Sequence, residues 1–301
     1  MFLVWCHEQG IDPLTARPAE IGWYRVWREL HGARGRCAKP TTVARALASI
    51  SSWYTHLAVT ADGSISHNPL IGALRPAVSA YAAGSPGPDP EEVDALLTQA
   101  DTQAANRTRQ WLDDPTAEHC RRHLVGLRNR ALLRLLADLG LRIGQALERD
   151  VADLTVSEGS RVLRYPGRAG EMRDRVIPAG TVAVIDDYLT ARVAAAGIGV
   201  SQLTGALFAT FRRDGVEGRV VEPNVFMMIR DLARRAGIAS GGTWSPQSLR
   251  HAFAAGAFRA GVPLQDVQDA MGHANPAVTR RYDAAGYSAV RDPAHYFSAR
   301  R

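Results

Sequence analysis

The chain has 301 residues, of which 46% are apolar and 22% are charged. This length suffices for two domains of ordinary size, and this apolar content excludes a disordered chain. The 36 basic residues outnumber the 30 acidic ones, which gives a formal charge of +6. Lys39 is the only lysine, so nearly all positive charge belongs to arginine, the better bidentate partner for phosphate. This balance favours a nucleic-acid partner without establishing one.

Cysteine content and hydropathy bear on the cellular location. The 3 cysteines lie far apart and form no C-x-x-C pair, which argues against a disulfide framework or a zinc knuckle. No apolar run approaches the roughly 20 residues that span a bilayer, and no basic segment followed by an apolar one opens the chain. We therefore expect a cytoplasmic protein without a membrane segment.

A seam rich in proline and glycine divides the chain at residues 83–90. Such a composition cannot continue a helix and is typical of a linker. Asp89 can cap a following helix, Pro90 suits its first position, and Glu92 can complete a capping box. The expected organisation is a domain at residues 1–83, a linker at 84–90 and a second domain at 91–301.

The first domain is predicted to be a small helical bundle. Gly10 ends an apolar run that follows Met1 directly, so we expect a first helix cut short, by a misassigned start or a truncated gene. Thr41 and Thr42 are expected to cap a later helix. Apolar residues recur at helical spacing on two predicted core faces: Ile21, Tyr24, Trp27 and Leu30, then Val43, Leu47, Ile50, Tyr54 and Leu57.

The second domain is predicted to be mainly α, with a small antiparallel sheet. A leucine-rich stripe at residues 131–139 predicts a buried helix that Gly140 stops. Two β-rich runs between Arg161 and Pro178, joined by a glycine-rich turn, predict a hairpin, and residues 207–209 predict one more short strand. Further helices are expected near residues 181–195, 223–236, 245–260, 263–271 and 275–283.

Four short motifs in this domain carry chemical information. They are GLRIGQ at 140–145, QSLRH at 247–251, MGH at 271–273 and TRRY at 279–282. Together they resemble the tyrosine recombinase, or phage integrase, family, which has G-L-R-x-x-E, H-x-x-R-H and L-G-H boxes and a tyrosine nine residues after the last histidine. Here Tyr282 lies 9 residues after His273, and His273 lies 23 residues after Arg250, both as in the family. The resemblance covers nearly the whole chain.

The resemblance implies a helical core-binding (SAM-like) bundle followed by an α-rich catalytic domain, closing on DNA as a C-shaped clamp. It implies a site-specific recombinase or integrase that cleaves and rejoins double-stranded DNA through a 3′-phosphotyrosyl intermediate. The expected assembly is a homo-tetramer on paired sites and a monomer or dimer off DNA. Neither a metal nor another cofactor is expected.

The chemistry of the matching residues agrees with these roles. Cleaving a phosphodiester without a metal needs a nucleophile, groups that neutralise the non-bridging oxygens, and a proton for the departing 5′ oxygen. Tyr282 is the candidate nucleophile, since a phosphotyrosyl link stores the energy for rejoining. Arg142 and Arg250 can each present a planar fork to phosphate, and His273 can add a hydrogen bond. His251 is expected to support the site by packing.

Two glutamines depart from the family pattern. Gln145 replaces an acid and can hold a neighbouring group by a hydrogen bond without adding charge. Gln247 stands where the family has histidine, and an amide cannot take a proton from Tyr282 at neutral pH. We therefore expect a slowed enzyme.

The hairpin holds the most serious departure. The family has a lysine there that protonates the leaving 5′ oxygen, and Arg168 is the best match in this chain. Arg173 and Arg175 match the end of the same family segment. Arginine releases a proton less readily than lysine, so Arg168 would be a poor general acid.

Other interpretations remain open from the sequence. The departures at Gln247 and Arg168 fit a degenerate relative that binds DNA without cutting it. A type IB topoisomerase-like enzyme would use the same nucleophile and arginines to relax supercoils. His119 and His123 share a helix face, but no third ligand follows at a usual distance, so no metal site is predicted.

Overall fold

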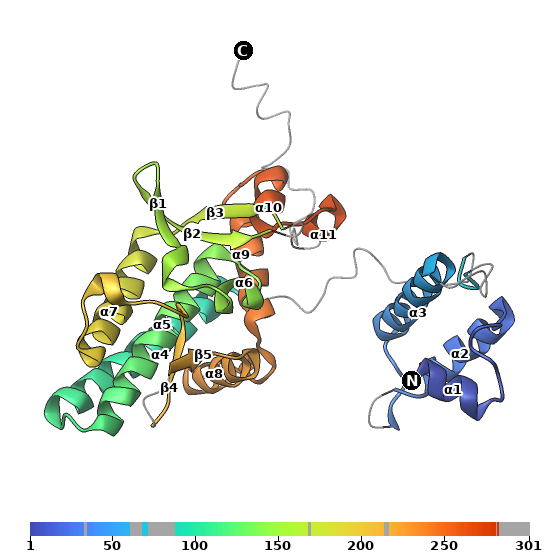
Figure 1. Ribbon diagram of the computed structural model, residues 1–301, viewed down its shortest axis with the longest axis horizontal. Coiled ribbons are helices and arrows are strands. Elements are labelled where there is room, and N and C mark those ends of the chain that lie inside the picture. Colours follow the sequence, from blue (N-terminus) through green and yellow to red (C-terminus); the bar gives the residue numbers. More distant parts are fainter. Residues whose placement is uncertain are drawn as a thin grey trace, which may run out of the picture. The chain divides into compact units, whose positions relative to one another are not determined.

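The computed structural model describes residues 1–32, 35–60, 68–71, 88–167, 170–213, 217–280 and 282. The chain forms two compact units, Met1–Ala82 and Ala83–Arg301 (Figure 1). The division falls at the predicted proline- and glycine-rich seam, of which residues 83–87 lie outside the described part.

The first unit contains the helices α1 (Phe2–Glu8), α2 (Pro18–Leu30) and α3 (Pro40–Thr60). Its core contains several aromatic rings: Phe2 and Trp5 each lie edge-on to Tyr24, with ring centroids 5.0 and 5.3 Å from that of Tyr24. The predicted core faces are confirmed at the buried positions Ile21, Tyr24, Val43, Leu47, Ile50 and Tyr54.

Two expectations for this unit were wrong. Leu30 is 61% exposed, because it is the last residue of α2 and lies beyond the packed part of the helix. Thr41 and Thr42 do not cap α3, because Pro40 already opens that helix and both threonines lie in its first turn.

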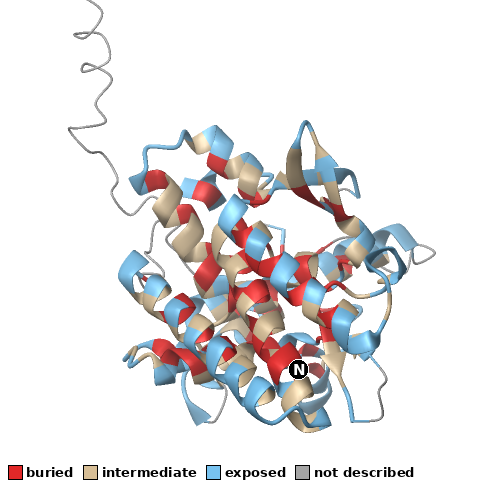
Figure 2. Cartoon of the chain, turned by 90° about the vertical axis from the view of Figure 1, so that its left-hand side faces the viewer, coloured by how far each residue is buried: buried red, intermediate tan, exposed pale blue. Residues whose placement is uncertain are grey.

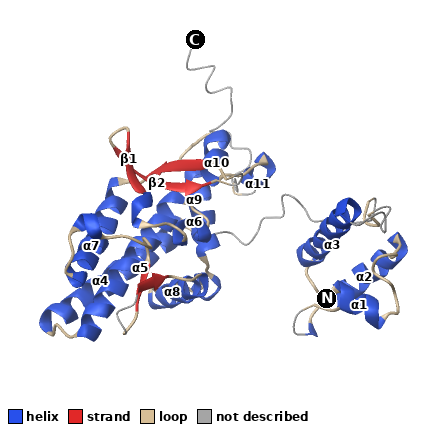
Figure 3. Cartoon of the chain, viewed as in Figure 1, coloured by secondary structure: helices blue, strands red, loops and turns tan. Residues whose placement is uncertain are grey.

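The second unit is mainly helical and has two small sheets (Figure 3). Its helices are α4 (Pro90–Asp113), α5 (Ala117–Leu139), α6 (Ile143–Leu147), α7 (Ala179–Ala196), α8 (Glu222–Arg235), α9 (Pro246–Arg259), α10 (Leu264–Met271) and α11 (Pro276–Arg280). Short 3-10 turns occupy Val151–Asp153, Val200–Gln202 and Gly241–Thr243. None of the helices in the described ranges is long and apolar enough to cross a membrane.

Helix α5 is the central element of this unit. It packs against α4, α7 and α9, and it is buried on several faces, so Leu133 is covered as fully as Leu132 and Leu136. Figure 2 shows the buried positions gathered between the helices. The start of the neighbouring α4 is as predicted, since Asp89 accepts a hydrogen bond from the Glu92 amide at 2.8 Å.

The predicted hairpin is confirmed and belongs to a larger sheet. Strands β1 (Leu154–Ser157), β2 (Ser160–Pro166) and β3 (Met172–Val176) pair antiparallel in the order β1-β2-β3. The strand expected at 207–209 begins only at Ala209. As β4 (Ala209–Phe211) it pairs with β5 (Glu217–Arg219), which the sequence did not predict.

Gly140 ends α5 as expected, in the left-handed conformation with φ +60°. A Cβ on Gly140 would overlap the ring of Phe253 on α9. Gly140→Ala should therefore lower the free energy of unfolding by about 2–5 kcal/mol, as the sum of backbone strain and overpacking.

Gly197 is a matched control, because it ends α7 with φ +64° and a Cβ there would meet nothing within 4 Å. Gly197→Ala should cost only the backbone strain, about 1–2 kcal/mol. Denaturant unfolding of both variants measures the difference, and equal losses would mean that Phe253 does not constrain Gly140.

Candidate active site

Arg142 follows the end of α5 and is the N-cap residue of α6. Its backbone N–H donates to Oε1 of Gln145 at 2.9 Å. The side-chain amide of Gln145 thus makes the capping hydrogen bond that an acid at this position could make. The guanidinium of Arg142 reaches a different segment, where Nη2 donates to the carbonyl of Gly272 at 3.3 Å.

Arg250 lies on α9 and is only 2% exposed. Its Nη1 donates to the carbonyl of Gly140 at 2.6 Å, and its Nη2 donates to the carbonyl of Met271. One side chain thereby joins the ends of α5 and α10. Burial, followed by the charge of Arg142, lowers the pKa of Arg250 to about 10, so it stays cationic at neutral pH.

His273 lies just after Gly272, which ends α10. Its Nε2 is 3.1 Å from Nη2 of Arg250, and its Nδ1 is 2.9 Å from Oγ1 of Thr279. Burial lowers the pKa of His273 to about 4, with added effects from the positive charges of Arg250 and Arg142. The imidazole is therefore neutral at physiological pH.

Tyr282 is half-buried and packs between two histidines. Its ring stacks on that of His273, with 5.9 Å between the ring centroids and an interplanar angle of 12°. It lies edge-on to the ring of His251, with 4.7 Å between the centroids. Its hydroxyl is 3.5 Å from Nε2 of Gln247, the long limit of a hydrogen bond. The structure thus brings five of the six candidate residues together: Arg142, Gln247, Arg250, His273 and Tyr282.

The sixth candidate, Arg168, lies outside the described residues, so its position at the hairpin turn is untested. Two other hairpin arginines occupy one face of β3. Arg173 donates to the carbonyl of Asp269 at 3.2 Å, and Arg175 donates to the carbonyl of Leu139 at 3.2 Å. From the sequence, both were matched to the end of the family's hairpin segment. Their alternate spacing on a strand could have predicted that the two side chains share one face of the sheet.

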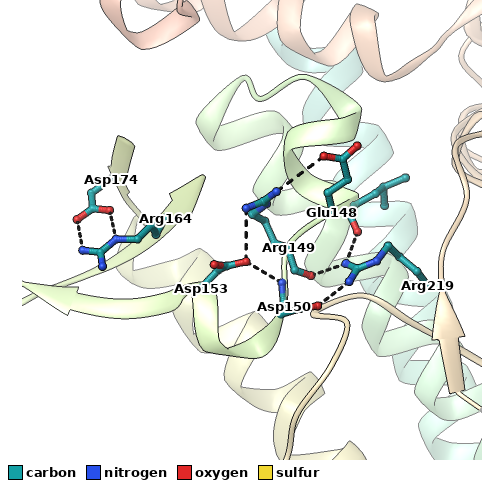
Figure 4. Close-up of polar contacts among 8 residues, drawn as sticks. Glu148, Arg149, Asp150, Asp153, Arg164, Asp174 and Arg219 are labelled. Atoms are coloured by element: carbon teal, nitrogen blue, oxygen red, sulfur yellow. Dashed lines mark hydrogen bonds and ion pairs between the residues drawn. The ribbon is translucent and has the colours of Figure 1, made fainter. Parts of the chain in front are cut away.

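Carboxylates neutralise many arginines elsewhere in the second unit. Figure 4 shows three of them: Arg149 pairs with Asp153 at 3.5 Å, Arg164 with Asp174 at 2.9 Å and Arg219 with Asp150 at 2.6 Å. Within the described ranges, Arg142 and Arg250 contact uncharged groups instead, as do Arg128 and Arg175.

In the part of the chain that the structure describes, no carboxylate therefore neutralises the charge of Arg142 or of Arg250. An open cleft of about 680 Å³ reaches this place, and Arg142, Gln145, Phe226 and Gln247 are among the residues that line it. An anion entering the cleft would meet the guanidinium of Arg142 and the side chain of Gln247, whose Nε2 lies 3.5 Å from the Tyr282 hydroxyl.

The histidine pair on α5 has other partners. Nδ1 of His119 lies 2.8 Å from the carbonyl of Asp114, and Nδ1 of His123 lies 2.9 Å from Oγ1 of Thr108. His123 also stacks on Trp111 at 4.7 Å. Among the residues with described positions, no group of three or more His, Cys, Asp or Glu side chains could hold a metal ion.

Several known proteins are similar to this chain. Residues 116–288 match the phage integrase family. The tyrosine recombinase XerC of Rhodospirillum centenum is 30% identical over 292 residues, covering 95% of this chain and 74% of the relative. XerD of Mycobacterium leprae is 36% identical over 171 residues, 55% of this chain and 51% of the relative.

The fold also has a counterpart among solved structures. XerH site-specific recombinase bound to a palindromic difH substrate superimposes with a TM-score of 0.64 at 16% identity, over 94% of this chain and 73% of that one. The family match covers more than half of the chain and includes every residue of the cluster around Tyr282. The chain therefore belongs to the phage integrase family, the tyrosine recombinases that cleave and rejoin DNA at specific sites.

Proposed function

We propose that this recombinase acts through Tyr282, whose phenolic oxygen attacks a DNA phosphodiester. The observation that carries the proposal is the chain of contacts from Tyr282 to His273 and on to Arg250, which is bonded to the end of α5 just before Arg142. A nucleophile, an imidazole and two guanidinium groups from separate segments converge, and they can supply the attack and the charge neutralisation of metal-free phosphoryl transfer.

In the proposed reaction the Tyr282 oxygen bonds to phosphorus and the bond from phosphorus to the 5′ oxygen breaks. Arg142 and Arg250 hold the non-bridging oxygens, and His273 donates a further hydrogen bond. The tyrosine proton passes to water, because the Gln247 amide cannot accept it. A 5′ hydroxyl of another strand then reverses the step and frees Tyr282.

Arg250 retains binding capacity for such a phosphate. A guanidinium has five N–H donors. Arg250 directs them to two carbonyls and to His273 Nε2, which leaves about two for an incoming oxygen. Burial, with the positive charges of Arg250 and Arg142, lowers the pKa of His273, so a neutral imidazole would donate to the phosphate oxygen from its Nε2–H.

The proposed partner is double-stranded DNA, contacted by both units of the chain, with a homo-tetramer on paired sites. Arginine–phosphate contacts would supply most of the affinity. The three cysteines, Cys6, Cys37 and Cys120, are all free, which fits action in the reducing cytoplasm.

The nucleophile is tested with a nicked suicide DNA substrate carrying candidate sites. Wild-type protein should form a covalent adduct that survives denaturing electrophoresis, and Tyr282→Phe should form none, because only the phenol oxygen is lost. The variant must still bind the DNA. Absence of an adduct on DNA that wild type binds would favour the degenerate relative, and relaxation of plasmids lacking paired sites would favour the topoisomerase-like alternative.

The proposed phosphate contacts predict strong salt dependence. Raising the salt from about 50 to 200 mM should weaken DNA binding by about a thousandfold or more, because each contact releases counterions. Titrations by fluorescence anisotropy measure the slope, with circular dichroism to check that the protein stays folded. An affinity independent of salt would contradict the proposal.

Arg168 is proposed to stand in for the family lysine that protonates the leaving oxygen. Arg168→Lys should therefore maintain or raise the cleavage rate on the suicide substrate, because lysine releases its proton more readily. Arg164→Lys is the control, since Arg164 pairs with Asp174 away from the cluster. A sharp loss in Arg168→Lys alone would place the general acid elsewhere in the hairpin.

A further inference from the structure

Thr279 on α11 contacts both the imidazole and the segment that carries the phenol. It is fully buried, with 0% of its surface exposed. Its Oγ1 is 2.9 Å from Nδ1 of His273, and its backbone carbonyl accepts the N–H of Tyr282 at 3.0 Å. The four family motifs give this side chain no chemical role.

The neighbours of His273 determine which ring nitrogen carries the proton in the free protein. Nε2 faces the Arg250 guanidinium at 3.1 Å, and a guanidinium can only donate. Because the ring is neutral, Nε2 must then hold the lone pair and Nδ1 the proton. Nδ1–H therefore donates to the Thr279 hydroxyl.

The proposed reaction requires the other tautomer of the His273 ring. His273 contributes to catalysis by donating from Nε2 to a phosphate oxygen. In a neutral imidazole Nε2–H requires Nδ1 to accept a hydrogen bond instead. A hydroxyl can do either, because it has one proton and two lone pairs. A carbonyl could only accept, and a methyl group could do neither.

We propose that Thr279 is the positioning residue that allows His273 to exchange its proton between the two ring nitrogens. In the free protein the hydroxyl accepts from Nδ1–H. With a phosphate in place the proton moves through water to Nε2, and the hydroxyl turns to donate to Nδ1. The proton count is unchanged, and the nitrogen facing Thr279 keeps a partner throughout. This inference rests on the proposed role of His273.

The charged groups around His273 are cations that cannot accept a hydrogen bond from its ring, so this role falls to Thr279. The groups facing the ring are the cations Arg250 and Arg142, with Tyr282 stacked on it and His251 on the other side of that tyrosine. Within the described ranges no carboxylate contacts His273 to fix one tautomer, as an acid does in many histidine sites.

The first test compares Thr279→Val, which keeps the shape and removes the hydroxyl, with Thr279→Ser, which keeps the hydroxyl. Thr279→Val should cleave the suicide substrate about tenfold to a hundredfold more slowly, the effect of leaving a buried polar group without a partner. Thr279→Ser should recover most of the rate. Equal rates for the two variants would overturn the proposal.

Thr181→Val controls for the loss of any buried threonine hydroxyl. Thr181 on α7 is 1% exposed and donates to Asp138, in a part of the unit that the proposed reaction does not use. Thr181→Val should lower the melting temperature without slowing the chemical step of cleavage. A rate loss in Thr181→Val as large as in Thr279→Val would mean that general destabilisation explains both.

The second test reads the ring directly, by ¹⁵N NMR of His273 in the full chain. Wild type and Thr279→Ser should show a proton on Nδ1 in the free protein. In Tyr282→Phe bound to uncleaved DNA the proton should lie on Nε2, and Thr279→Val should lose this change. A free wild-type ring protonated on Nε2 would overturn the inference whether or not the protein cleaves DNA. A wild type that cuts no DNA would instead refute the proposed function.

Discussion

The arrangement of the segments around Tyr282 in the second unit depends on the hydrogen bonds of one buried guanidinium. Arg250 joins the carbonyl ends of α5 and α10, and it also touches His273. Helix ends carry carbonyls without intrahelical partners, and a cation there satisfies them and interacts favourably with the helix dipole. The same contacts hold the segments of Arg142 and His273 at a fixed separation, so the structural and the proposed chemical roles of Arg250 are inseparable.

The local parts of this structure were predictable because they depend on short-range chemistry. The capping box at Asp89 and the end of α5 at Gly140 follow from rules that involve a few neighbouring residues. Strands β1 and β5 were missed because they have only 4 and 3 residues, too few for an alternating pattern to stand out, so their pairing comes from the sheet rather than from the segment.

The site was predictable in its members but not in its contacts. Motif spacing selected Arg142, Arg250, His273 and Tyr282, which converge in the structure. No spacing rule could indicate that Arg250 binds the carbonyl of Gly140, since that contact joins segments that only the tertiary fold brings together. Thr279 lies only six residues after His273, and their contact depends on how the chain turns between α10 and α11. Burial by that fold also produces the low pKa of His273.

The amide at position 145 has an electrostatic consequence. A carboxylate at the N-terminus of α6 would cap the helix equally well, but it would also offset part of the positive potential around Arg142. Gln145 keeps the cap and leaves that potential intact. Glu148 and Glu222 line the same cleft, so Arg142 is the place where sulfate or phosphate from a buffer would bind and compete with substrate beyond the effect on ionic strength.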